Sequence, residues 1–378
     1  MTSDQPFIAR HSWKRLDGVD VLRGLAILFV LMNHVQIRLL LANIAFTDAL
    51  PEQLVSSLFW NGQRGVQIFF VISGFLITST SLRRWGSLSQ VSVRDFYRLR
   101  FARIGPLLFL LLTVLSGLHF AHVDHFVVAQ KTGGLGGALL AALTFHVNVL
   151  EARRGYLPAN WDILWSLSVE EMFYLFFPWV SRLLGYGKPL ILILCAFVLL
   201  GPVGRTFLDH GSEVWHEYSY LGSMDAIALG CLTALLVSRM RFSSTALWMI
   251  GSIGITVVSV CLCFSLMLDR WGLGRNGLDM SMLAVGTCMV VATAALKQWQ
   301  APRVLIPLLK LGQFSYEVYL SHMFVVFFLF GLFSYIGSPA RGVAPLFGLV
   351  ILIAGVLGAG IAKFYSEPMN KLLRCQVS

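Results

Sequence analysis

Long apolar segments alternate with short polar ones along almost the whole chain. Ten of the apolar segments are long enough to cross a membrane as a helix, since about 20 residues span the roughly 30 Å hydrocarbon layer. The pattern therefore predicts an all-α integral membrane protein of about ten transmembrane helices. The predicted spans are 21–43, 65–82, 104–120, 163–183, 189–207, 221–238, 245–267, 280–297, 314–335 and 343–363.

An eleventh apolar segment, 136–150, is short and begins among four glycines. If it does not cross and the N-terminus is cytoplasmic, 20 of the 29 basic residues lie on the cytoplasmic side. That distribution follows the positive-inside tendency of membrane proteins, whereas a crossing segment would turn two later basic loops outward. We therefore expect a re-entrant or interfacial segment, protected inside the protein, and cytoplasmic locations for both termini.

The composition supports a single membrane domain. Charged residues make up 13% of the chain, compared with about 25% in soluble domains. We expect a cytoplasmic N-terminal tail at 1–15, a transmembrane domain at 16–365 and a cytoplasmic C-terminal tail at 366–378. The first apolar run is too long for a cleavable signal peptide, and we expect a multi-pass protein of a bacterial cytoplasmic membrane.

The net charge of +10 raises the question of nucleic-acid binding. The basic residues lie in short clusters between apolar runs, and no basic stripe with interleaved aromatic residues is present, so we exclude that class. None of the six cysteines makes a zinc-type spacing with histidines, and five lie within apolar runs. We therefore expect no metal site and no disulfide framework.

Two ionisable residues share one face of the first span. His34 follows Arg23 by eleven residues, about 1100° of helical rotation and only about 20° from full registry. Asp20 precedes Arg23 by three residues and can pair with it. Ionisable groups in the hydrocarbon are costly and usually face a site or pathway, which favours function. The alternative is an arginine reaching the interface and a histidine bonded to a neighbouring helix.

The second and third spans carry further candidates. Ser73 and Gly74 lie deep in the second span, where small residues either let helices pack closely or leave space for a substrate chain beside His34. A cluster of four arginines, Arg94, Arg98, Arg100 and Arg103, precedes the third span. They are either a topology signal in contact with lipid headgroups or a site for a phosphorylated ligand, because guanidinium groups match phosphate oxygens.

The fourth span begins with an unusual pair of adjacent carboxylates, Glu170 and Glu171. Ser166, Glu170 and Tyr174 share one helical face at spacings of four residues, while the two glutamates point about 100° apart. We therefore expect only one of the two carboxylates in the cavity that contains His34. A structural role is the alternative for this segment, which also contains Trp165.

The ninth span repeats this kind of polar stripe. Ser315, Tyr319 and His322 can line one face of a helix that begins near position 314. A structural ladder of hydrogen bonds explains the stripe at least as well as catalysis does.

Together these segments resemble the acyltransferase-3 family of integral-membrane acyltransferases, and the resemblance extends from Leu16 to about Lys363. The residues that carry it are Leu22-Arg-Gly-Leu-Ala26 with His34, the Phe-Phe-Val-Ile-Ser-Gly-Phe run ending at Phe75, Arg100 and Arg103 before Pro106, the stretch from Trp165 to Tyr174, and the stretch from Ser315 to His322.

The resemblance implies about ten helices and the transfer of an acyl group, usually acetyl, from cytoplasmic acyl-coenzyme A to a hydroxyl of a saccharide or another outer-surface acceptor. It implies that His34 is catalytic with Arg23 as its partner, and that Arg100 and Arg103 bind coenzyme A. The chain departs from the commoner pattern by two extra residues, Val19 and Asp20. We expect no additional hydrolase-like domain after the last span.

We therefore predict a membrane O-acyltransferase, an O-acetyltransferase in particular, with acyl-CoA, a saccharide or glycolipid acceptor and the bilayer as partners. His34 would be the general base, and Glu170 would orient it. A route through an acyl-histidine stays open. The alternative class is a proton-coupled transporter or flippase with His34 as a proton relay. We predict Arg98, Arg100, Arg103 and Ser73 for donor binding and Asp20, Trp165, Ser166, Tyr174, Tyr319 and His322 for substrate binding.

Overall fold

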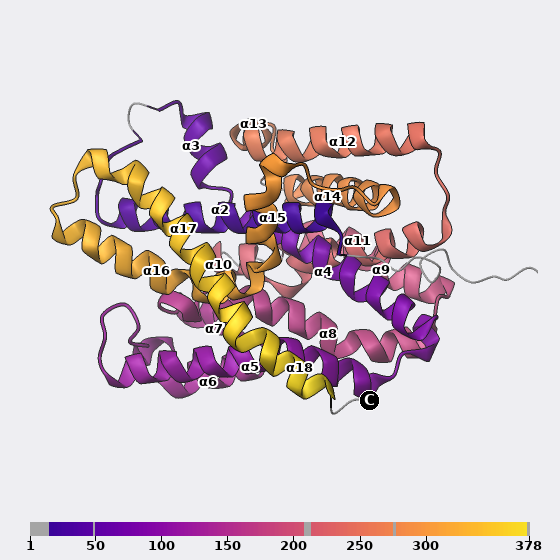
Figure 1. Ribbon diagram of the computed structural model, residues 1–378, viewed down its shortest axis with the longest axis horizontal. Helices are drawn as coiled ribbons and strands as arrows, with labels where there is room; N and C mark the ends of the chain where they lie inside the picture. The colour runs from indigo at the N-terminus through magenta and orange to yellow at the C-terminus, as the bar shows by residue number, and fades with distance from the viewer. Residues whose placement is uncertain (1–14, 48–49, 208–212, 275–276, 376–378) are drawn as a thin grey trace, which may run out of the picture.

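The computed structural model describes residues 15–47, 50–207, 213–274 and 277–375, and within these ranges every regular element is a helix (Figure 1). The apolar pattern therefore predicted the fold class correctly. Nine stretches of the described chain are long and apolar enough to cross a membrane. They contain the helices α2 (Asp17–Leu41), α4 (Gly62–Trp85), α5 (Val93–Phe120), α9 (Lys188–Phe207), α11 (Tyr220–Arg239), α12 (Ser244–Cys263), α14 (Leu278–Lys297), α16 (Ser315–Tyr335) and α17 (Val343–Ile361).

The tenth predicted span corresponds to α8 (Leu164–Leu184), which is not among these nine apolar stretches. Its 21 residues extend about 31 Å at about 1.5 Å per residue, which is enough to cross the hydrocarbon layer. Glu170 and Glu171 near its start reduce its apolar character. The count of ten spans and the cytoplasmic location of the termini stay predictions.

The segment predicted not to cross forms two short helices, α6 (Gly134–Leu143) and α7 (Val147–Arg154). Their lengths of about 15 Å and 12 Å are half or less of the hydrocarbon thickness. Neither helix can therefore cross the membrane alone. Two single turns, η2 (Gln130–Thr132) and η3 (Ala159–Trp161), complete the connection from α5 to α8.

The predicted C-terminal tail begins with a helix. A π-helical turn, η6 (Ala362–Ser366), joins α17 to α18 (Glu367–Cys375), and α18 packs along α5 (Figure 1). The predicted N-terminal tail lies outside the described residues except for Arg15. The remaining short helices are α3 (Glu52–Phe59), α10 (Glu213–Tyr218), α13 (Ser265–Arg270), α15 (Ile306–Gln313), η1 (Leu88–Gln90), η4 (Arg303–Leu305) and η5 (Ala340–Gly342).

The closest approach between α4 and α11 depends on two glycines. A Cβ atom at Gly74 would lie 1.9 Å from the carbonyl oxygen of Ile227, and one at Gly230 would lie 2.1 Å from that of Val71. Small residues let membrane helices approach to backbone contact in this way. The space beside Gly74 is therefore occupied by the backbone of α11, and the prediction that Gly74 leaves space for a substrate chain is wrong.

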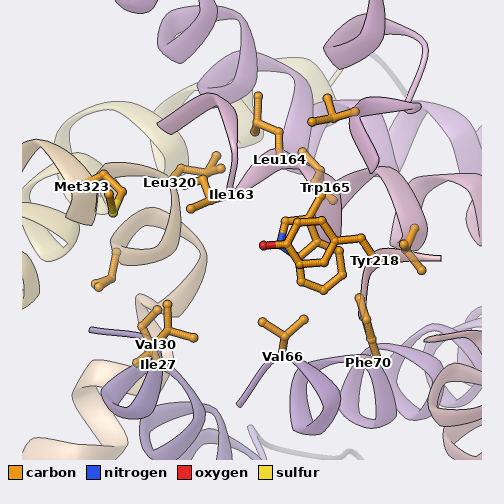
Figure 2. Close-up of a cluster of buried hydrophobic side chains, with 14 of the residues drawn as sticks. Ile27, Val30, Val66, Phe70, Ile163, Leu164, Trp165, Tyr218, Leu320 and Met323 are labelled. Atoms are coloured by element: carbon orange, nitrogen blue, oxygen red, sulfur yellow. The ribbon is translucent and has the colours of Figure 1, made fainter. Parts of the chain in front are cut away.

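A buried apolar cluster joins the helices that carry the polar candidates (Figure 2). The indole ring of Trp165 on α8 stacks on the ring of Tyr218 on α10, with their centroids 4.0 Å apart and an angle of 4° between the planes. The cluster fixes α2, α4, α8 and α16 relative to one another. Its labelled members are Ile27, Val30, Val66, Phe70, Ile163, Leu164, Trp165, Tyr218, Leu320 and Met323.

Candidate active site

Two histidines meet between α2 and α16. The Nε2 atom of His322 lies 3.4 Å from Nδ1 of His34, and the ring centroids are 4.9 Å apart in an edge-to-face arrangement. His322 is fully buried, whereas His34 is partly exposed. Packing of α2 against α16 therefore brings together two imidazoles that are 288 residues apart in the sequence.

For neutral imidazoles, the backbone carbonyls define which ring nitrogen carries the proton. Nδ1 of His34 lies 2.8 Å from the carbonyl oxygen of Val30, and Nδ1 of His322 lies 2.6 Å from that of Tyr319. A carbonyl only accepts, so we assign the proton of each ring to Nδ1. Nε2 of His322 is then an acceptor facing His34, and Nε2 of His34 carries a lone pair available to a substrate.

The two adjacent glutamates bind one arginine. Arg100 donates from Nη2 to Oε1 of Glu170 and of Glu171, both at 2.8 Å, and from Nε to Oε1 of Glu171 at 3.0 Å. Oε1 of Glu170 also accepts from Ser73 Oγ at 2.6 Å and from the Tyr174 hydroxyl at 2.9 Å. We call these five residues the Arg100 cluster. Glu170 is thus hydrogen-bonded within this cluster, and no hydrogen bond joins it to His34, whose partners are Val30 and His322.

A cavity of about 620 Å³ lies beside the Arg100 cluster, between α2, α4, α5, α8, α16 and α18. On α4 its lining runs from the buried Val66 to Trp85, about 28 Å at about 1.5 Å per residue. The exposed Arg84 marks the open end, which the predicted topology puts at the cytoplasmic face. The cavity therefore leads from the end marked by Arg84 towards the middle of the bundle.

The inner end of the cavity borders the histidine pair. Tyr319 lines the cavity, and its ring centroid lies 5.8 Å from that of His322. The Tyr319 hydroxyl forms hydrogen bonds with Ser166 Oγ at 2.6 Å and with the carbonyl oxygen of Ile163 at 3.1 Å. Neither His34 nor His322 lines the cavity itself, so Tyr319 separates the cavity from the pair.

A model of the acyltransferase-3 family, described as an acyltransferase domain, matches residues 16–363. The chain belongs to this family. It is similar to the O-acetyltransferase OatA of Staphylococcus aureus (strain NCTC 8325 / PS 47), with 23% identity over 96% of this chain and 58% of that protein. A putative O-acetyltransferase of S. aureus (strain COL) is 24% identical over 87% of this chain and 54% of its own length.

The chain thus spans little more than half the length of these curated relatives. No solved structure matches it. Within the described ranges, no group of three or more His, Cys, Asp or Glu side chains is arranged to hold a metal ion.

The remaining predicted residues of this acyltransferase-3 family member either line the cavity or pack outside it. Arg23 and Arg103 line the cavity, while Arg98 is exposed and does not. Asp20 is buried, 2.7 Å from Arg15 Nε and 4.0 Å from Arg23 Nη1. Asp20 therefore anchors two cations at the start of α2 and lies outside the cavity lining.

Trp165 is likewise a packing residue in the described structure, since it stacks on Tyr218 and does not line the cavity. Ser166 and Tyr174 do line it. Sequence reasoning did not select Arg84 or Arg374, which line the cavity from the last turns of α4 and α18. The available signal was two cationic helix ends, which the helix dipole also favours, so it was not specific.

A second pair of carboxyl groups lies in the connection between α5 and α8. Glu151 is fully buried, and its Oε1 accepts from the backbone N–H of Leu157 at 3.0 Å. Burial, together with the neighbouring Asp162 carboxyl, raises the pKa of Glu151 well above its usual range. Burial therefore disfavours the charged form of this carboxyl, which accepts a backbone hydrogen bond within the connection.

Proposed function

We propose that this protein transfers an acetyl group from cytoplasmic acetyl-CoA to a hydroxyl of a saccharide or glycolipid on the extracytoplasmic side of the same membrane. One observation carries the proposal: in a chain of the acyltransferase-3 family, an arginine-lined cavity ends beside a histidine pair. The relatives named O-acetyltransferase support acetyl as the group and oxygen as the acceptor atom.

The cavity walls suit the parts of acetyl-CoA in order. Arg103 and Arg23 line it, and their guanidinium groups match the phosphate oxygens of the coenzyme. Apolar side chains on α4, such as Ile72 and Leu76, line the stretch between the mouth and the inner end. Such a wall accommodates the largely uncharged pantetheine arm, which would bring the thioester towards Tyr319.

The proposed reaction moves one proton from the acceptor hydroxyl to His34 and then to the departing sulfur. As the acceptor oxygen attacks the thioester carbonyl, His34 Nε2 removes the hydroxyl proton. The tetrahedral intermediate then collapses, the C–S bond breaks, and the departing sulfur takes the proton from the imidazolium. An ester and free coenzyme A thiol result, and His34 returns to its neutral form. A base of this kind contributes about 10²-fold to 10⁴-fold in rate.

His322 is the positioning residue for this base. Its Nε2 lone pair faces Nδ1–H of His34 at 3.4 Å, which favours the tautomer with the free electron pair at Nε2. It takes the orienting role that we first assigned to Glu170. Glu170 instead holds Ser73, Tyr174 and Arg100 in the cavity wall.

A transporter or flippase is the less favoured function, because the family match and the named relatives point to acyl transfer. The two functions make different predictions for purified protein. An acyltransferase releases coenzyme A thiol in step with acetylation, whereas a transporter leaves acetyl-CoA intact. Membrane vesicles that contain the protein in a bacterial cytoplasmic membrane provide both the donor side and the acceptor side.

The experiment supplies radiolabelled acetyl-CoA to such vesicles and measures label in saccharide together with thiol release. His34→Gln should reduce both by about 10²-fold or more while acetyl-CoA binding stays unchanged. His322→Asn keeps an acceptor near His34, whereas His322→Phe removes it. The phenylalanine variant should therefore lose more activity than the asparagine variant and should show a shifted pH–rate profile.

Folding is checked by the melting temperature of each variant in detergent. A His34→Gln protein that melts like the wild type and transfers acetyl at the wild-type rate would refute the assignment of the base. Wild-type protein that neither binds acetyl-CoA nor releases thiol would refute the acetyltransferase function as a whole.

A further inference from the structure

The lining of the cavity is strongly unbalanced in charge. Among its lining residues are six arginines and one carboxylate, that of Glu170, which Arg100 already neutralises. Such an excess of cations in one cavity repels itself unless a polyanion occupies it. The arginines are Arg23, Arg83, Arg84, Arg100, Arg103 and Arg374.

The deeper arginines have carboxylates nearby. Arg100 binds Glu170 and Glu171, Arg103 lies 3.8 Å from a carboxylate of α16, and Arg23 lies 4.0 Å from Asp20. These contacts share or neutralise their charges. These contacts do not involve the arginines at the open end of the cavity.

Arg84 and Arg374 have no carboxylate within 4.0 Å among the described residues. Both are exposed, and both line the mouth of the cavity. Arg374 lies close enough to Arg84 and Arg103 for the like charges to oppose one another. Three separate helices, α4, α5 and α18, therefore direct cations to one place.

The helix dipole does not explain this convergence. A cation in the last turn of a helix is stabilised by the dipole whichever way the side chain points. Arg84 and Arg374 end different helices, and the dipole gives neither a reason to line the same cavity as Arg103. A shared anionic ligand does give that reason, since guanidinium groups from several sides can surround one phosphate.

We propose that Arg84 and Arg374 bind the 3′-phosphate of the coenzyme A donor and that this contact makes the enzyme selective for acyl-CoA over its 3′-dephospho form. The inference rests on the proposed function. With the thioester at the inner end, the diphosphate lies nearer Arg103 and Arg23, and the 3′-phosphate is the group left at the mouth. Helix α18 is then part of the donor site.

The test is calorimetric titration of acetyl-CoA and of 3′-dephospho-acetyl-CoA into the full-length protein in detergent. Wild-type protein should bind acetyl-CoA about tenfold more tightly or better, the scale of one or two charged hydrogen bonds at a solvated site. Arg84→Gln and Arg374→Gln should each reduce that ratio, and the double variant should bring it close to one. Arg374→Lys should keep part of it, because a point charge replaces the fork.

Matched controls come from α18, which carries Arg374, and from α5, which carries Arg103. Arg94→Gln on α5 and Lys371→Gln on α18 remove exposed cations that do not line the cavity. Both should keep the wild-type ratio. If they lower it as much as the cavity variants do, a general loss of positive charge explains the effect and the assignment is overturned.

Other outcomes separate this inference from the proposed function. The 3′-phosphate site would be overturned if wild-type protein bound both donors with equal affinity, or if the variants lowered the affinity for both donors by the same factor. Neither outcome would contradict acetyl transfer. A third arm uses nanodiscs with and without phosphatidylglycerol. If replacing Arg374 changes acetyl-CoA binding only when that lipid is present, the arginines bind a lipid phosphate. That outcome also overturns the proposal.

Discussion

Replacing Arg100 by glutamine tests whether this residue supports the fold or binds the donor. The sequence assigned it to coenzyme A, whereas in the structure it donates three hydrogen bonds to Glu170 and Glu171. Its side chain is 20% exposed, and those of the two glutamates are 21% and 9% exposed. The pairs are therefore mostly removed from solvent, and glutamine would leave two adjacent carboxylates without their cation.

The expected loss follows from this burial. Removing one partner of a buried ion pair typically costs about 3–5 kcal/mol, because the remaining charge keeps its desolvation penalty. Partial exposure of Glu170 and protonation of one carboxylate reduce the loss, so we expect about 3 kcal/mol for Arg100→Gln. At about 2 °C per kcal/mol for a chain of this size, the melting temperature should fall by at least about 5 °C.

The assay is thermal unfolding in detergent, with acetyl-CoA titration of each protein that remains folded. Adding Glu171→Gln to the Arg100→Gln background should restore part of the stability, because it removes one uncompensated charge. Arg94→Gln, which removes an exposed cation from the same helix, is the control and should melt like the wild type. Refutation would be an Arg100→Gln protein of normal stability that binds acetyl-CoA less tightly.

Two further predictions concern packing and pH. Gly74→Ala should destabilise the protein by about 1–3 kcal/mol, as overpacking does, because the new Cβ would lie 1.9 Å from the Ile227 carbonyl oxygen. The control is Gly117→Ala on α5, whose Cβ would meet no atom within 4 Å and which should be neutral or slightly stabilising. Equal melting temperatures of the two variants would contradict the α4–α11 contact. Glu151→Gln keeps an acceptor for the Leu157 N–H. Since the folded-state pKa of Glu151 is raised, wild-type stability falls as pH rises above the unfolded-state pKa of about 4.3. In thermal unfolding the variant should therefore gain stability relative to the wild type as pH rises from about that value, and parallel pH curves would contradict the shift.

The long apolar helices of this fold could be predicted because apolar length is a property of local composition, whereas short helices such as α3, α15 and α18 were not predicted. Apolar segments of about 20 residues become helices in a membrane wherever they lie, since the backbone must satisfy its own hydrogen bonds there. The segment 136–150 was set apart from the spans by the distribution of basic residues, which follows the positive-inside tendency only if this segment does not cross. The polar start of α8 shows the limit: Glu170 and Glu171 lower the apolar signal of a helix whose partner, Arg100, is 70 residues away.

The site residues could be selected as candidates, but their pairings could not be predicted. A sequence indicates that His34, Glu170 and His322 are unusual in apolar surroundings, and it carries no information on which of them meet. Helix packing decides that His322 contacts His34 while Glu170 contacts Arg100. Arg374 was missed for the same reason, since only the packing of α18 on α5 brings it to the cavity.

The cost of removing a charge from water explains why Arg100 has carboxylate partners while Arg84 and Arg374 have none among the described residues. Inside the bundle a cation without a partner is costly, and Arg100 is paired with Glu170 and Glu171 of α8. Glu170 in turn accepts hydrogen bonds from Ser73 and Tyr174. At the mouth Arg84 and Arg374 are exposed, and water stabilises their charges, so they need no neighbouring carboxylate before an anion binds. A carboxylate introduced near Arg374, as in Lys371→Glu, would compete with that anion one turn away. It should weaken acetyl-CoA binding more than Lys371→Gln does, and the difference should shrink in high salt because exposed charges are screened.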